Sequence, residues 1–147
     1  MGCACTCGTG ILGGVGVMAK KETTVEYTRK IAVAMGLGGW VIEETADPAS
    51  EGCLAEIEPT YGQRHAKLSL CKEWDELPKE EQRNTIVHEL VHVALASLTQ
   101  LSYDIVESLD EGAVKASRAA LNLAEEYVVD AIAEAWAPYM PLPGGGV

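Results

Sequence analysis

Residues 85–98 read TIVHELVHVALASL, with apolar residues at a spacing that predicts a helix. His88, Glu89 and His92 form the pattern H-E-x-x-H within it. Residues four apart lie on one helical face, so the imidazoles of His88 and His92 can reach the same metal ion. Ionisable groups on a helix otherwise rich in Val, Leu and Ala are costly to bury unless a metal compensates them. The stretch therefore predicts a zinc site.

The composition indicates one acidic globular domain. The chain has 147 residues, of which 48% are hydrophobic, and this suits a single modest core. Lys and Arg number 11 against 22 Asp and Glu, which gives a net charge of −11 and argues against nucleic-acid binding. No apolar run is long enough to span a membrane, and no basic segment precedes residues 11–18 as in a secretory signal. We therefore expect a cytoplasmic protein.

The first 20 residues differ in character from the rest. Residues 1–17 are rich in glycine and carry no charge, so we expect residues 1–20 to be a disordered or appended tail. Met1 to Thr6 fits a myristoylation pattern, and membrane attachment is expected only if this tail is lipidated. We favour over lipidation the interpretation that Met18 is the functional start and that the preceding segment is upstream sequence. The domain itself is expected at residues 21–140, followed by a flexible tail at 141–147.

Local patterns place helices and strands along the domain. Helices are expected at residues 23–35, from Pro78 to about Thr99, and from Ser108 to about Ala137; strands are expected at residues 40–44, 53–58 and 64–70. Gly36 is expected to stop the first helix, and Ser108 with Glu111 is interpreted as a capping box that starts the last one. Residues 100–107 are expected to be a connection or a short helical piece.

The strand at residues 64–70 alternates between apolar and polar residues. Its inward positions are Ala66, Leu68 and Leu70, and its outward positions are Arg64, His65, Lys67 and Ser69. Because His65 falls on the polar face, we expect it to contact solvent or substrate and not the metal ion.

The third metal ligand must come from elsewhere in the chain, because catalytic zinc usually has three protein ligands and one open position. No histidine follows His92, which leaves carboxylates on the last helix. Glu125 lies in an apolar stripe, so burial would require it to have a partner. Glu126 shares a face with Asp130, which could orient a ligating imidazole. We favour Glu126, with Glu125 as the open alternative.

H-E-x-x-H followed on a later helix by Glu126-x-x-x-Asp130 is similar to the gluzincin metallopeptidases. The order of elements resembles minimal single-domain zincins, such as the short metallopeptidase-like chains of bacteriophage and prokaryotic genomes, and the resemblance covers about residues 22–140. It implies an α+β fold. This fold would comprise an N-terminal helix, a small three-stranded sheet, the motif helix and a long C-terminal helix.

The resemblance also implies an activity. Zn²⁺ would be held by His88, His92 and Glu126, with Glu89 as the general base that activates a water to hydrolyse a peptide bond of a peptide or protein substrate. The strand at residues 64–70 would be the edge strand that pairs with the substrate, with His65 and Lys67 lining the cleft.

The sequence does not decide which residue stabilises the oxyanion or whether the chain is an enzyme. Tyr103 and Tyr127 are candidates to stabilise the oxyanion, although single tyrosines near such a helix more often serve packing. The alternative function is a zinc-stabilised protein-interaction module without turnover. The presence of Glu89 weighs against that alternative, because a structural site needs no general base.

Overall fold

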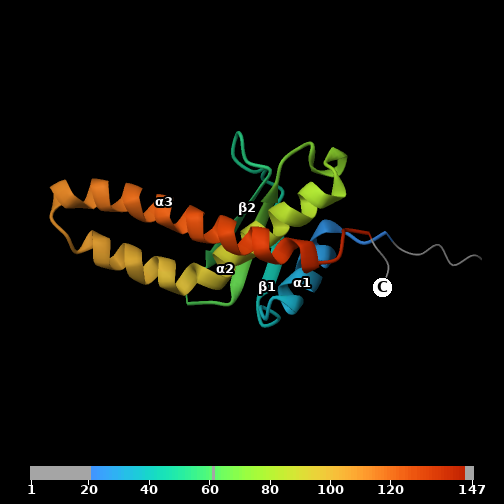
Figure 1. Ribbon diagram of the computed structural model, residues 1–147, viewed down its shortest axis with the longest axis horizontal. Helices are drawn as coiled ribbons and strands as arrows, with labels where there is room; N and C mark the ends of the chain where they lie inside the picture. Colours follow the sequence, from blue (N-terminus) through green and yellow to red (C-terminus); the bar gives the residue numbers. More distant parts are fainter. Residues whose placement is uncertain (1–20, 61, 145–147) are drawn as a thin grey trace, which may run out of the picture.

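The computed structural model describes residues 21–60 and 62–144 as a mixed α+β fold (Figure 1). The segments expected as tails at residues 1–20 and 145–147 lie outside the described residues. The elements, in chain order, are α1 (Thr24–Ala34), β1 (Val41–Glu44), β2 (Ala55–Thr60), β3 (His65–Leu70), the 3₁₀ turn η1 (Trp74–Glu76), α2 (Lys79–Glu107), α3 (Glu111–Trp136) and the 3₁₀ turn η2 (Ala137–Tyr139). The expected α+β class, with three helices and a three-stranded sheet, is confirmed for these residues.

The sheet has the strand order β1-β3-β2. β1 runs parallel to β3, with Val41 opposite His65, and β2 runs antiparallel to β3, with Ile57 opposite Leu68. β3 is therefore the central strand, and the prediction that residues 64–70 form the edge strand beside the motif helix is wrong. That position belongs to β2. The alternation of residues within one strand indicates which of its faces is buried, but it does not indicate which strands lie on either side. Here β3 is central because β1 pairs with it in parallel.

The core lies between the sheet and the helices α1 and α2. Ile31 of α1, Ile42 of β1, Leu68 of β3 and Leu90 of α2 are all fully buried and belong to one cluster. Ala66 and Leu68 face this core while Lys67 is exposed, so the predicted alternation of β3 is confirmed. The sheet holds α2 in place through this cluster, and the H-E-x-x-H motif lies on α2.

Local signals fix α1 at both ends. The Thr23 hydroxyl accepts a hydrogen bond from the Glu26 backbone N–H, and the Glu26 carboxylate accepts one from the Thr23 backbone N–H, forming a capping box. At the other end, Gly36 adopts a φ of 80°, and the Leu37 N–H donates to the Ala32 carbonyl at 2.7 Å. This is the left-handed glycine cap that the sequence predicts.

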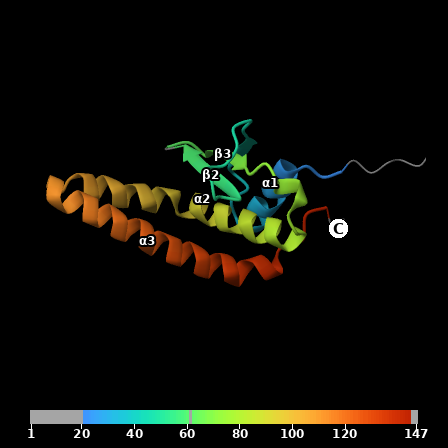
Figure 2. The same ribbon diagram turned by 90° about the horizontal axis from the view of Figure 1, so that it is seen from above.

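The helices α2 and α3 form a long hairpin that projects beyond the sheet (Figures 1 and 2). α2 continues to Glu107, so the expected end near Thr99 is wrong and residues 100–107 are its last two turns. The N-cap of α3 is Asp110, whose carboxylate accepts from the Ala113 N–H. The expected capping box at Ser108 is also wrong, because Ser108 caps the end of α2. The α2–α3 contact extends α2 further than its own sequence signals indicate.

The chain after η2 is attached to α1. The Tyr27 hydroxyl donates to the Pro141 carbonyl at 2.8 Å, and the Gly144 N–H donates to the Glu22 carboxylate at 3.0 Å. The first part of the segment expected as a flexible tail is therefore held by hydrogen bonds. Among the described residues, no helix combines the length and apolar character needed to cross a bilayer.

The packing of α1 generates a stability prediction. Ile31 is fully buried whereas Val33, two residues along, is 66% exposed. Ile31→Ala should lower the free energy of unfolding by about 2–5 kcal/mol, because it leaves a cavity in the core. Val33→Ala should change it by less than about 0.5 kcal/mol. Urea denaturation of the two variants checks this, and equal losses would show that α1 does not pack as described.

Candidate metal centre

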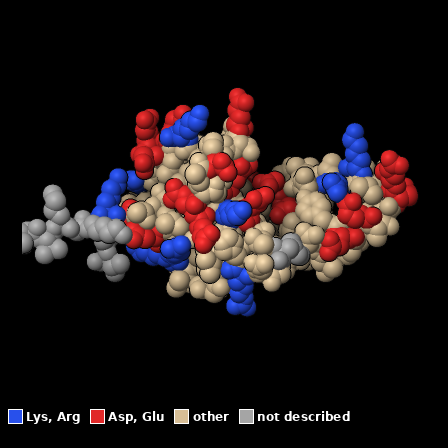
Figure 3. Space-filling view, turned by 180° about the vertical axis from the view of Figure 1, so that it is seen from behind, with Lys and Arg blue, Asp and Glu red and all other residues tan. Residues whose placement is uncertain are grey.

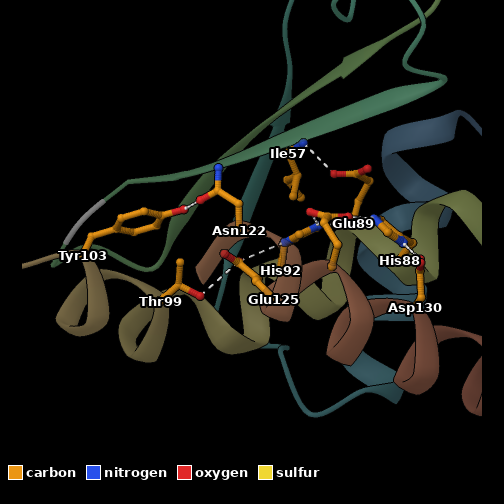
Figure 4. Close-up of polar contacts among 10 residues, drawn as sticks. Ile57, His88, Glu89, His92, Thr99, Tyr103, Asn122, Glu125 and Asp130 are labelled. Atoms are coloured by element: carbon orange, nitrogen blue, oxygen red, sulfur yellow. Dashed lines mark hydrogen bonds and ion pairs between the residues drawn. The ribbon is translucent and has the colours of Figure 1, made fainter. Parts of the chain in front are cut away.

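The two histidines of the motif point their rings at one place. His88 and His92 lie one turn apart on α2, and their Nε2 atoms are 3.2 Å from each other (Figure 4). The rings are arranged edge to face, with centroids 5.0 Å apart. Both side chains are partly buried against α3. The i, i+4 spacing therefore brings two nitrogen donors together, as the sequence predicts.

Glu126 of α3 completes a group of three donors. Its carboxylate oxygens lie 3.7 Å from His88 Nε2 and 3.5 Å from His92 Nε2. The candidate ligand atoms of the three residues are all within 4.8 Å of one another. Two ligands bound at 2.0–2.1 Å to a tetrahedral zinc ion would lie about 3.3–3.4 Å apart. The observed separations thus fit zinc, and three protein donors leave one position free.

The other ring nitrogens are bound by two further carboxylates. His88 Nδ1 lies 3.1 Å from Asp130 Oδ1, and His92 Nδ1 lies 3.2 Å from Glu125 Oε1. The Thr99 hydroxyl donates to the same Glu125 oxygen at 3.0 Å. A carboxylate at Nδ1 favours the tautomer with its proton there, which leaves the Nε2 lone pair directed at the common point. In that tautomer both imidazoles could bind a metal ion through Nε2.

The arrangement distinguishes the two adjacent glutamates of α3. Glu126 lies beside the two Nε2 atoms, whereas Glu125 lies beside Nδ1 of His92 and is only 15% exposed. Glu125 thus has the buried partner that the sequence predicts for it, the His92 ring. Glu126 lies where a third metal ligand is expected, beside the Nε2 atoms. Asp130 occupies the orienting position that was expected for it.

Glu89 lies between α2 and the edge strand. Its Oε2 atom accepts a hydrogen bond from the Ile57 backbone N–H of β2 at 2.9 Å. It is the one buried carboxylate of the described residues, and this burial raises its pKa to about 8, with the Ile57 hydrogen bond acting in the opposite direction. A carboxyl group with such a pKa can exchange a proton near neutral pH.

A cleft of about 740 Å³ runs along β2, α2 and α3. Figure 3 shows acidic side chains gathered in a hollow between the sheet and the projecting hairpin. The lining includes Ile57 and Pro59 of the edge strand together with Glu89, His92 and Glu126. The candidate donors and Glu89 are therefore open to a molecule that enters beside β2.

The structure separates the remaining candidates. Lys67 lines the cleft, but His65 does not; its Nε2 lies 3.1 Å from the Glu43 carboxylate of β1. Tyr103 lines the far end, where its hydroxyl donates to the Asn122 side chain, and Tyr127 is 68% exposed and does not line the cleft. The expectation that His65 lines the cleft is wrong, because His65 lies at the start of β3 opposite Thr60, beyond the part of β2 that lines the cleft.

Sequence reasoning missed Thr99 and Ile57. Thr99 lies seven residues after His92 and thus on the same helical face, a spacing that could have indicated its contact with Glu125. The Ile57 N–H carries no side-chain signal, so only the register of β2 against α2 reveals it. Comparison of the chain with protein-family models, with curated proteins and with solved structures finds no match.

The two glutamates of α3 can be compared directly. We expect Glu126→Ala to reduce zinc affinity by more than about 100-fold, because it removes a donor. Glu125→Ala should reduce it by about 10–100-fold, since it removes only the partner of His92 Nδ1. Competition with a chromophoric chelator measures both affinities. A larger loss in Glu125→Ala would reverse the assignment.

The raised pKa of Glu89 generates a prediction for the metal-free protein. Its pKa is about 8 in the fold, against an ordinary value of 4.5 for a glutamate in water. Folding favours the protonated form of Glu89. The contribution of Glu89 to the stability of the fold is therefore fully present below about pH 4.5 and is lost as the pH rises through 8. In chelator, wild type should therefore lose stability between pH 5 and 8 relative to Glu89→Gln, which stays neutral. Parallel melting temperatures of the two proteins across this range would contradict the assignment.

Proposed function

We propose that the chain is a zinc-dependent hydrolase of peptide bonds, with His88, His92 and Glu126 as the zinc ligands. The observation that carries the proposal is the pair of oriented imidazoles. Each Nε2 lies within 3.7 Å of Glu126, while each Nδ1 contacts a separate carboxylate. Paired histidines with carboxylate partners behind them are typical of zinc sites.

The protein supplies a base beside this site. Zinc, when bound, acts as a Lewis acid towards a water molecule and a carbonyl group. Glu89 is next to His88 in the chain and lines the same cleft, and its carboxylate can take a proton at Oε and return it to a leaving nitrogen.

The edge strand supports a peptide as the substrate. Ile57 directs its N–H to Glu89, so the alternate residues of β2 present their backbone groups to the cleft. An extended peptide could add to this edge by backbone hydrogen bonds. Such a substrate would compete with Glu89 for the Ile57 N–H. Its arrival would therefore release the Glu89 carboxylate for proton transfer.

A second candidate function is a zinc-stabilised interaction module without turnover. The Glu89–Ile57 hydrogen bond favours it, since this contact gives Glu89 a structural role in joining α2 to β2. The two candidates share the metal ligands and differ in what Glu89 does. Substituting Glu89 alone therefore distinguishes them.

The purified protein should hold about one zinc ion per chain after zinc supplementation, and Glu89→Gln should leave this content unchanged. The variant should lose hydrolysis of a mixed fluorogenic peptide library by at least about 100-fold, because an amide cannot accept the proton. Metal analysis and peptide turnover measure the two quantities.

The matched control is Glu81→Gln, the same substitution in the first turn of α2, at an exposed site outside the cleft. It should keep both zinc and activity. Absence of zinc from the wild type would overturn the metal site. Zinc binding with no turnover of any peptide in wild type would leave the interaction module as the function.

A further inference from the structure

An apolar stripe on α2 is buried beside the sheet and becomes exposed to solvent where the hairpin projects beyond the sheet. The stripe begins with Val87 and Val91, which are buried in the core. It continues at the spacing i, i+3, i+7 with Leu98, Leu101 and Ile105, which are 63%, 56% and 58% exposed. The spacing is that of one helical face. Within the described residues, three large aliphatic side chains thus stand in a row on the hairpin without a partner element.

The neighbouring helix presents a parallel row of two alanines that ends in the larger Val128. Ala120, Ala124 and Val128 of α3 are all exposed and lie four residues apart. Together with Leu98, Leu101 and Ile105 of α2 they form what we term the back face. The back face combines a ridge of large side chains on one helix with a groove of small ones on the other.

The back face lies opposite the cleft on both helices. Leu98 is nine residues from Glu89, which is two and a half turns and so half a turn out of phase. Ala124 and Val128 are each two residues from Glu126, about 200° around α3. Glu89 and Glu126 line the cleft. A partner on the back face would therefore leave the candidate metal centre accessible.

We propose that the back face binds a second copy of this chain, so that two hairpins form a four-helix bundle. A two-fold axis parallel to the hairpin would place α2 of each copy on α3 of the other. Leu98, Leu101 and Ile105 would then enter the groove along Ala120 and Ala124. Such a surface is self-complementary, as an isologous dimer requires.

The size of the back face suits a modest dimer. At roughly 100 Å² for each large aliphatic side chain and less than half of that for each alanine, one copy would bury on the order of 500 Å². Two copies would bury about 1,000 Å², the lower limit for a specific interface. We therefore expect a dimer that dissociates on dilution and not an obligate one.

The charges around the back face favour a protein partner over a membrane. None of its residues is charged, and the cations of the hairpin between residues 94 and 128 are Lys115 and Arg118. Arg118 is already bound by Glu107. Helices that lie on membranes usually carry many Lys and Arg residues, whereas this part of the hairpin has these two.

Sedimentation equilibrium of the zinc-loaded full chain across about 1–300 μM tests the proposal. We expect a monomer–dimer equilibrium in wild type. Leu101→Lys and Ala124→Lys, which change the ridge and the groove separately, should each weaken dimerisation by at least tenfold. Circular dichroism should show unchanged helix content, because both positions are exposed. Val33→Lys is the matched control, an equally exposed position on α1, and should leave the equilibrium unchanged.

Three outcomes would overturn the proposal. Wild type could remain monomeric over the whole range, or both lysine variants could dimerise as wild type does. The third is that wild type binds phosphatidylcholine vesicles as a monomer and Leu101→Lys does not, which would identify a lipid surface as the occupant. Failure of zinc binding or hydrolysis would bear on the metal centre alone, because the back face includes none of its residues.

Discussion

The contact between α2 and α3 contains ionisable groups, and each of these groups needs a partner on the other helix. An imidazole or carboxylate taken out of water is stable only with a hydrogen-bonding partner. α2 brings two partly buried histidines to the contact, and α3 meets them with Glu125, which is largely buried, and with the more exposed Glu126 and Asp130. The contacts that join α2 to α3 here are therefore the same contacts that bring together the residues of the candidate metal centre.

Three features of the fold follow from this shared contact. The hairpin needs the sheet on the other side of α2, since the core around Ile31, Leu68 and Leu90 fixes the helix that presents the histidines. Glu125 also contacts Thr99, almost two turns beyond His92, so the polar part of the contact continues past the sheet. Polar contacts between the helices continue at Tyr103–Asn122 and Glu107–Arg118, while the apolar face of α2 is exposed from Leu98 onward.

Much of the fold could be predicted because its signals are local. The ends of α1 follow from the Thr23 and Glu26 capping box and from Gly36, and the buried face of β3 follows from alternation. The length of α2 could not be predicted, because residues 100–107 are helical through packing on α3. The place of β3 in the sheet was also beyond local signals, because a strand's sequence does not state which strands flank it.

In the candidate site, too, some residues could be predicted from local spacing and others could not. His88 and His92 could be paired from helical spacing alone, and the face shared by Glu126 and Asp130 identified two more residues. The separate roles of Glu125 and Glu126 depend on how α3 is rotated against α2, which periodicity leaves open between adjacent residues. The contact of Glu89 with the Ile57 N–H depends on the backbone of β2, which has no signature in the residue types.

The edge strand β2 has one consequence for the behaviour of the protein in concentrated solution. Open edges of sheets recruit other strands and so promote aggregation. Of the backbone donors that alternate towards this edge, the one at Ile57 is taken by Glu89 and the one at Pro59 is absent, because proline has no N–H. A strand that does not displace Glu89 therefore finds neither of these donors, whereas the proposed peptide substrate would have to displace Glu89 from the Ile57 N–H. The side chain that is expected to serve as a base in the cleft thus also occupies a backbone donor through which another strand would pair with this edge.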